Sequence, residues 1–199
     1  KNGGPAIRMF AFGDSTMEGP AGWPDGGTPW ESFWQSMFPR LGTYRGLYLP
    51  IVAENKAVGG TRLPQMDALP WLSGDTDAFI IKYGLNDASI GNGSLEVFAE
   101  ALDTKLREIR EAPFGAWTDL TIILVGPNST FDAPFGRTSE WYEQLRGIYV
   151  AAARKWKCAY FDTYALMPDS TEAAGRWLDA PFPDNPLRGV HPEMIGYAW

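Results

Sequence analysis

The stretch IRMFAFGDSTMEG, residues 7–19, runs from a row of apolar side chains into a sharp polar break. The row from Ile7 to Phe12 is typical of a strand that is buried on both faces of a parallel sheet. Because ligands of open parallel sheets bind beyond the carboxyl ends of the strands, Ser15 is a candidate functional residue. On its own, a serine here is better explained as the cap of the next helix, and Asp14 is expected to order the turn.

Four more apolar runs of strand length follow along the chain. They span residues 48–54, 77–84, 120–127 and 158–164, and segments with helical periodicity lie between them. Strands that alternate with helices predict an α/β fold, a three-layer α/β/α sandwich with about five parallel strands. The sequence contains no internal repeat and no linker-like segment, so residues 1–199 are expected to form a single domain.

Two of the helical segments are amphipathic. Residues 94–112 place a row of apolar side chains on one face: Leu95, Phe98, Leu102, Leu106 and Ile109. Residues 139–157 carry a comparable row, and Ser139 is the expected N-cap of that helix. Both rows are expected to face the sheet.

The composition excludes several classes of protein. With 199 residues, of which 45% are hydrophobic, the chain can bury a full core, which excludes disorder and a small disulfide scaffold. The formal net charge is −7 and the charges are scattered, so the chain has no basic footprint and nucleic acid is not an expected partner. No apolar run approaches the ~20 residues of a membrane span.

Metal and cofactor chemistry also find little support in the sequence. One histidine and one cysteine cannot build a zinc site of the common kinds, and neither a phosphate-binding loop nor a dinucleotide fingerprint occurs, so no cofactor is expected. The nucleophile elbow of the α/β-hydrolases is absent as well. The chain begins at Lys1 rather than Met, as a processed or excised segment would, and an extracellular or secreted location is the favoured expectation.

Three further blocks lie near the ends of other predicted elements. NKAVGGTR contains Gly59 and Gly60, where a bare backbone can approach a ligand, and YGLND presents Asn86 after the third strand. GVHPEMIGYA supplies His191, the only histidine and so the only candidate for a base that activates Ser15. In isolation, a turn explains the glycines, and a helix cap explains Asn86. Backbone N–H groups and an amide are also the donors that a developing oxyanion needs.

The blocks FGDSTM, NKAVGG, GLND and GVHP, in this order, resemble those of the SGNH hydrolases, also called the GDSL-like esterase superfamily. The resemblance extends from Ile7 to Tyr197. It implies a flavodoxin-like sandwich in which Ser15 is the nucleophile and His191 is the general base. It also implies an oxyanion hole formed by the backbone N–H groups of Ser15 and Gly60 and the side-chain amide of Asn86.

One position departs from the pattern of the superfamily. Where its members usually have an aspartate three residues before the histidine, this chain has Arg188, and a guanidinium cannot accept the imidazole proton. Three alternatives follow: the site works as a Ser15–His191 dyad, as it does in some members of the superfamily; Asp179 or Asp184 replaces the missing acid; or activity has been lost. Asp184 is the better replacement because it lies closer in sequence, and we expect the dyad.

The expected function is that of a serine esterase that hydrolyses small acyl esters, acetyl in particular, on a carbohydrate. Several tryptophans lie in loops rich in Pro and Gly and would suit stacking on an acetylated saccharide: Trp23, Trp30, Trp71 and Trp177. Anchoring of loops is the commoner role of such residues. GDSTM also resembles the first block of acetylesterases that act on plant pectin. The alternatives are a lipid or thioester hydrolase and a catalytically degraded glycan-binding module of an extracellular or viral fibre.

Overall fold

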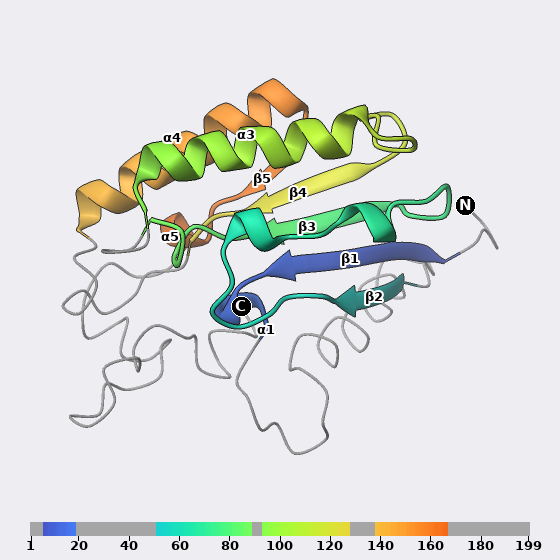
Figure 1. The fold of residues 1–199 in the computed structure, drawn as a ribbon, viewed down its shortest axis with the longest axis horizontal. Helices are drawn as coiled ribbons and strands as arrows, with labels where there is room; N and C mark the ends of the chain where they lie inside the picture. The colour runs from blue at the N-terminus through green and yellow to red at the C-terminus, as the bar shows by residue number, and fades with distance from the viewer. Residues whose placement is uncertain (1–5, 19–50, 89–92, 128–137, 167–199) are drawn as a thin grey trace, which may run out of the picture.

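The computed structural model describes residues 6–18, 51–88, 93–127 and 138–166, which form one parallel sheet with helices packed against it (Figure 1). The strands are β1 (Ile7–Gly13), β2 (Ile51–Asn55), β3 (Ala78–Lys82), β4 (Thr121–Val125) and β5 (Ala159–Phe161). All neighbouring pairs are parallel, and the order across the sheet is β2-β1-β3-β4-β5. This is the strand order of a flavodoxin-like sheet, so the predicted α/β fold with five parallel strands is confirmed.

The central strands β1 and β3 are apolar because both of their faces are covered. All five residues of β3 are buried, and so are the last five of β1. All five strands end at a residue other than the predicted one: β1 and β2 run one residue further, to Gly13 and Asn55, and β4 stops two residues earlier, at Val125. Strand β3 ends at Lys82 rather than Gly84, because the chain turns at Gly84 with a φ of 107°. Strand β5 ends at Phe161 rather than Tyr164, because the short helix α5 (Thr163–Leu166) begins two residues after Phe161.

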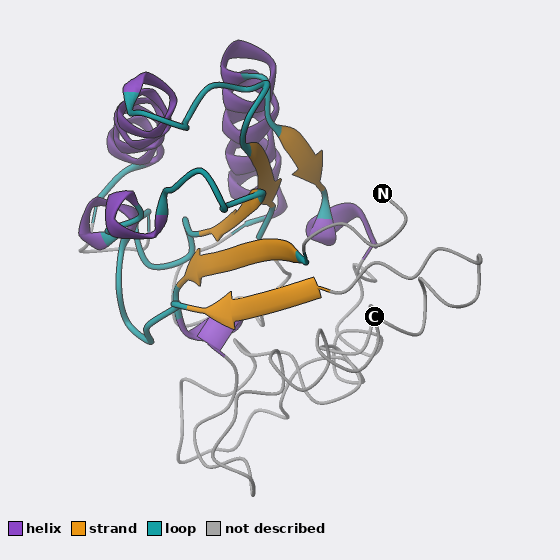
Figure 2. Cartoon of the chain, turned by 90° about the vertical axis from the view of Figure 1, so that its right-hand side faces the viewer, coloured by secondary structure: helices purple, strands orange, loops and turns teal. Residues whose placement is uncertain are grey.

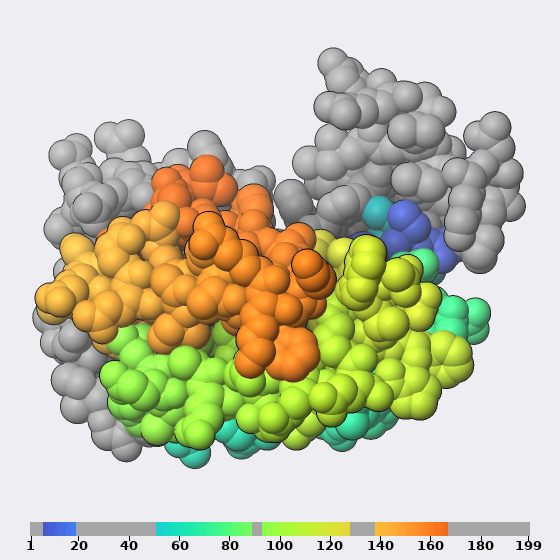
Figure 3. Space-filling model, turned by 90° about the horizontal axis from the view of Figure 1, so that it is seen from above, coloured from blue at the N-terminus to red at the C-terminus, as the bar shows by residue number. Residues whose placement is uncertain are grey.

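Two long helices, α3 (Leu95–Glu111) and α4 (Ser139–Trp156), lie side by side over one face of the sheet (Figures 1 and 3). The apolar row of α3 is buried as predicted at Phe98, Leu102, Leu106 and Ile109, whereas Leu95 is only partly buried. The predicted cap of α4 is wrong by one residue. Thr138 has the extended backbone of an N-cap and its hydroxyl accepts the N–H of Trp141, while Ser139 already belongs to the helix.

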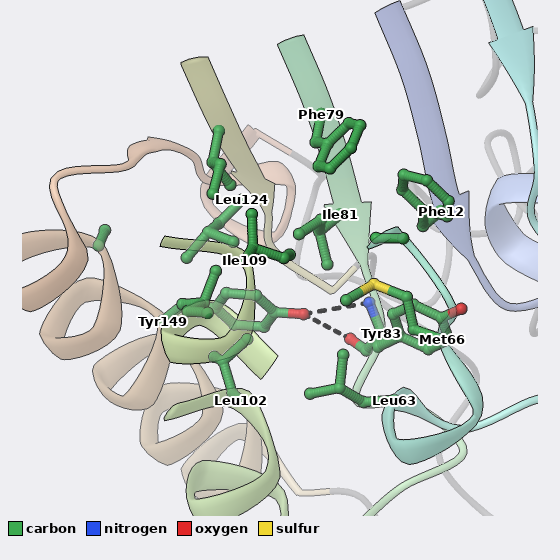
Figure 4. Close-up of a cluster of buried hydrophobic side chains, with 14 of the residues drawn as sticks. Phe12, Leu63, Met66, Phe79, Ile81, Tyr83, Leu102, Ile109, Leu124 and Tyr149 are labelled. Atoms are coloured by element: carbon green, nitrogen blue, oxygen red, sulfur yellow. Dashed lines mark hydrogen bonds between the residues drawn. The ribbon is translucent and has the colours of Figure 1, made fainter. Parts of the chain in front are cut away.

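The sheet separates two apolar clusters. The larger one lies between the sheet and the two long helices and includes Phe12, Phe79, Ile81 and Tyr149 (Figure 4). The smaller one lies on the other face, where the short helix α1 (Ser15–Glu18) packs Met17 against the strands (Figure 2). Apart from α1, the expected third layer of the sandwich falls on residues outside the described ranges.

The connection from β2 to β3 contains two 3₁₀ turns, η1 (Leu63–Gln65) and η2 (Leu69–Trp71), each with a proline in its first turn.

In the last turn of α3, Arg110 donates hydrogen bonds to four backbone carbonyls, those of Trp156, Lys157, Gly115 and Leu120. This one guanidinium therefore joins the end of α4 to the loop that enters β4. Among the helices of the described ranges, none is long and apolar enough to cross a membrane.

Candidate active site

The first part of the site is the turn that joins β1 to α1. Asp14 is 1% exposed, and its Oδ1 accepts hydrogen bonds from the backbone N–H of Thr16 at 2.9 Å and from the Thr16 hydroxyl at 2.7 Å. Asp14 therefore orders the turn, as predicted, and leaves Ser15 partly exposed as the first residue of α1. Gly13 has no room for a side chain, because a Cβ there would lie 2.5 Å from the Cβ of Met17.

The loop after β2 lies directly against this turn. The backbone N–H of Val58 donates to the carbonyl of Gly13 at 3.0 Å, and the Asn55 amide donates to the carbonyl of Met17 at 3.0 Å. A Cβ built on Gly59 would lie 3.6 Å from the Cβ of Ser15 and 2.6 Å from the Glu18 carboxylate. The absence of a side chain at residue 59 thus lets the backbone of this loop approach Ser15.

Gly60 follows with a backbone φ of 73°, in the left-handed region that residues other than glycine rarely adopt. The residue is exposed, and a Cβ built on it would meet nothing within 4 Å. The reason for glycine is therefore conformational rather than steric. This turn brings Thr61 toward β1, where its hydroxyl lies 2.6 Å from the carbonyl of Val58 and 3.3 Å from that of Gly13.

The loop after β3 completes the arrangement. The Asn86 amide donates to the carbonyl of Thr61 at 3.0 Å, so this side chain reaches the loop after β2. The Asp87 carboxylate is buried and accepts the backbone N–H groups of Leu63 and Gly84. The three loops that carry Ser15, Gly60 and Asn86 are therefore brought together at the carboxyl ends of β1, β2 and β3, where the predicted topology places them.

Sequence reasoning missed Lys82, the last residue of β3. Its side chain is on the α1 face of the sheet and is 7% exposed, and its Nζ lies 3.5 Å from the carbonyl of Thr16. Burial lowers the pKa of Lys82 from 10.5 to about 8, and the negative charge of Asp14 opposes that shift. The signal in the sequence is a single charged residue at the end of the apolar run AFII.

Two more buried groups around these loops have shifted pKa values. Burial raises the pKa of Tyr83 to about 12, although a hydrogen bond with Thr61 opposes the shift. Burial also raises the pKa of Asp87, against the effect of its backbone N–H donors. Perturbed ionisable groups gather at functional sites more often than elsewhere, which fits the position of this cluster beneath the three loops.

Other predicted site residues lie outside the described ranges: His191, Arg188, Asp179, Asp184, Trp23, Trp30 and Trp177. Trp71 is described and acts as a loop anchor, because its ring packs on Phe10 and the Nζ of Lys56 lies 3.9 Å from the ring centroid. Within the part of the chain that the structure describes, no group of three or more His, Cys, Asp or Glu side chains is arranged to hold a metal ion.

Known structures share this fold over nearly the whole chain. A lipase/acylhydrolase from Enterococcus faecalis matches with a TM-score of 0.69 and 22% identity, over 96% of this chain and 89% of that one. A carbohydrate acetylesterase family member from Sinorhizobium meliloti matches at 0.60 and 18%, over 96% and 92% of the two chains. Phospholipase A1 from Streptomyces albidoflavus matches at 0.60 and 15%, over 98% and 97%. At these identities the likeness shows the fold alone.

Sequence comparison adds the family. No curated protein matches the chain significantly. The model of the GDSL-like lipase/acylhydrolase family matches residues 11–199, which include all four blocks from the Ser15 turn to His191. The chain therefore belongs to the GDSL-like lipase/acylhydrolase family.

Proposed function

We propose that the protein is a serine esterase that removes small acyl groups, acetyl in particular, from a carbohydrate. The observation that carries the proposal is the proximity of Ser15 to the glycine loop after β2. The Cβ of Ser15 lies 3.6 Å from the position that a Cβ on Gly59 would take, and Asn86 is bound to the same loop through Thr61. The proximity of Ser15 to this loop supports a site in which a serine hydroxyl attacks an ester and the loop backbone donates hydrogen bonds to the oxyanion.

In the proposed mechanism, the Oγ of Ser15 attacks the ester carbonyl while His191 takes its proton as general base. The carbonyl π electrons move to oxygen and form a tetrahedral oxyanion. When the intermediate collapses, the C–O bond to the alcohol breaks, and His191 returns the proton to the leaving oxygen. Water then attacks the acyl-enzyme in the same way, which releases the acid and restores Ser15.

The proposed oxyanion hole consists of the backbone N–H groups of Ser15 and Gly60 and the amide of Asn86. The Ser15 N–H belongs to the first residue of α1. The left-handed turn at Gly60 sets the backbone that carries the second donor. The hydrogen bond from the Asn86 amide to the carbonyl of Thr61 holds the third donor beside the same loop. A preorganised donor of this kind contributes roughly 3 kcal/mol to the stability of the transition state.

We propose a dyad as the catalytic machinery, because Arg188 stands where an acceptor for the imidazole proton is usual. A backbone carbonyl or water would then orient His191. Asp184 is the alternative third member, and Asp179 is a weaker one because it is more distant in sequence.

Two observations support a carbohydrate ester as the substrate. The first block resembles that of pectin acetylesterases, and one of the similar structures is a carbohydrate acetylesterase family member. A lipid or thioester hydrolase is the second candidate, since a phospholipase matches the chain with the same TM-score. A degraded glycan-binding module is the candidate from outside the enzymes, and the observation that favours it is Arg188.

Hydrolysis of p-nitrophenyl acetate, butyrate and octanoate tests these candidates, together with acetate release from O-acetylated pectin fragments. We expect the highest kcat/KM for acetate and release of acetate from the saccharide, and neither activity in Ser15→Ala. Preference for octanoate would support the lipid hydrolase instead. A folded protein that hydrolyses no ester but binds the pectin fragments would support the glycan-binding module.

A further inference from the structure

The hydroxyl of Tyr149 makes two hydrogen bonds to the backbone of a single residue, Tyr83, 66 positions earlier in the chain. It donates to the Tyr83 carbonyl at 2.6 Å and accepts the Tyr83 N–H at 3.2 Å (Figure 4). Tyr149 comes from the middle of α4 and is 0% exposed. A buried phenol is both donor and acceptor, so it can serve the two polar groups of one peptide residue.

These two bonds take the place of a missing strand neighbour. The pairing of β3 with β4 ends at Ile81 and Leu124, so Tyr83 lies beyond it. Tyr83 is buried, and a buried backbone N–H or C=O without a partner is costly. The N–H and the C=O of Tyr83 both face the Tyr149 hydroxyl, which allows one side chain to serve both groups. Tyr149 thus extends the hydrogen bonding of β3 past the end of β4.

The segment held in this way leads directly to Asn86. Gly84 follows Tyr83 and turns the chain with a φ of 107°, and its N–H donates to Asp87 at 2.9 Å. The backbone at Gly84 is packed closely between α3 and α4, because a Cβ there would lie 3.3 Å from Phe98 and from Leu145. The direction in which the chain leaves β3 therefore decides where the Asn86 amide lies.

The ring of Tyr149 is itself held in place. It stacks on Tyr160 with 5.8 Å between the ring centroids and contacts Phe98 at 5.7 Å. Burial raises the pKa of Tyr149 well above its usual value, so the hydroxyl keeps its proton and remains a donor at neutral pH.

We propose that Tyr149 is a positioning residue of the active site: by holding the Tyr83 peptide, it sets the start of the β3 loop and so the place of the Asn86 amide in the oxyanion hole. This inference rests on the proposed function. Tyr149 does not touch the substrate, and it acts only through Asn86.

The first test is Tyr149→Phe, which removes the hydroxyl and keeps the ring. With p-nitrophenyl acetate we expect kcat to fall roughly 10- to 100-fold and KM to change less than about twofold, because a displaced donor weakens the transition state more than the ground state. Replacement of Tyr149 by p-aminophenylalanine, which restores a donor to the Tyr83 carbonyl, is expected to recover most of the activity. It also keeps the test decisive if Tyr149→Phe does not fold.

Tyr160→Phe is the matched control, because the same atom is removed from the ring that stacks on Tyr149. Asp162 and Arg146 lie close enough to affect the pKa of Tyr160, but its buried hydroxyl has no hydrogen-bond partner among the described residues. We expect kcat of this variant to stay within about twofold of the wild-type value.

A double-mutant cycle separates positioning from a general loss of stability. If Tyr149 acts through Asn86, Tyr149→Phe should lower kcat less than about twofold in an Asn86→Ala background. The side-chain amide NMR signals of Asn86 should also shift in Tyr149→Phe and not in Tyr160→Phe. An unchanged kcat in Tyr149→Phe, the same loss in both backgrounds, or unchanged Asn86 signals would each overturn the inference. If the wild type hydrolyses no ester, the proposed function fails, and the NMR comparison alone decides whether Tyr149 holds Asn86 in place.

Discussion

The Asp87 carboxylate accepts a 2.6 Å hydrogen bond from the backbone N–H of Leu63, which lies 24 residues earlier in the chain. Its other oxygen accepts the backbone N–H of Gly84 at 2.9 Å. One buried side chain thus ties the loop that carries Gly60 to the loop that carries Asn86. The relative position of two proposed oxyanion donors depends on this link.

Replacing Asp87 with alanine should therefore destabilise the protein. Asp87→Ala leaves the N–H groups of Leu63 and Gly84 buried without their acceptor, and we expect the free energy of unfolding to fall by roughly 2–5 kcal/mol. Urea denaturation followed by circular dichroism measures the loss. Asp67→Ala, an exposed aspartate of the same connection, is the control and should change the free energy by less than about 0.5 kcal/mol. Equal losses in the two variants would contradict a linking role for Asp87.

Removal of the proposed nucleophile or base should abolish turnover and spare the fold. We expect Ser15→Ala and His191→Ala each to lower kcat by several orders of magnitude, because the two residues act as one unit. A serine-reactive phosphonate should label Ser15, as located by mass spectrometry. Ser94→Ala, which removes the N-cap hydroxyl of α3, is the control and should keep its kcat. A Ser15→Ala enzyme with more than about a tenth of wild-type kcat would identify another nucleophile.

Lys82 should make stability depend on pH in the alkaline range. Its pKa is about 8 in the folded protein, against an ordinary value of 10.5, so between these values the unfolded chain holds a proton that the folded chain has lost. The cost of burying the charged amine is fully present below pH 8 and is lifted as the pH rises to 10.5. The free energy of unfolding should gain on the order of 3 kcal/mol across this window from Lys82 alone.

Comparison with Lys82→Met isolates that contribution, since the two proteins share every other titrating group. Urea denaturation at intervals from pH 7 to 10.5 should give a difference between wild type and variant that moves in favour of the wild type as the pH rises. Lys157→Met, at an exposed position, is the control and should produce no such trend. A constant difference between wild type and Lys82→Met would mean that Lys82 keeps its proton throughout.

The dyad predicts an unusual response to changes near His191. Arg188→Asp should preserve or raise kcat toward small esters, because it supplies an acceptor for the imidazole proton and removes a positive charge that disfavours the imidazolium. Asp184→Asn should change kcat by less than about tenfold. Profiles of kcat/KM against pH for both variants provide the measurement. If Asp184→Asn abolishes turnover without a change in circular dichroism, Asp184 is the third member and the dyad is wrong.

Several features could be predicted from the sequence because they depend on neighbours along the chain. The apolar runs around Phe10 and Ile80 identified strands β1 and β3, and the row from Phe98 to Ile109 identified the buried face of α3. The order of the four blocks identified the family, and the family model matches residues 11–199. Even here the ends were less certain than the elements, as the N-cap at Thr138 rather than Ser139 shows.

Other features were decided only when the chain folded, because they join residues that are far apart in sequence. The strand order brings β1 and β3 together, and only then do the Ser15 turn and the Asn86 loop become neighbours. A lysine at the end of an apolar strand acquires a lowered pKa only when α1 covers it. No local pattern marks Tyr149 as different from any other aromatic residue on an apolar helix face. Its hydroxyl bonds to Tyr83 because the pairing of β3 with β4 ends two residues before Tyr83, at Ile81 and Leu124, and only the packed tertiary structure determines that.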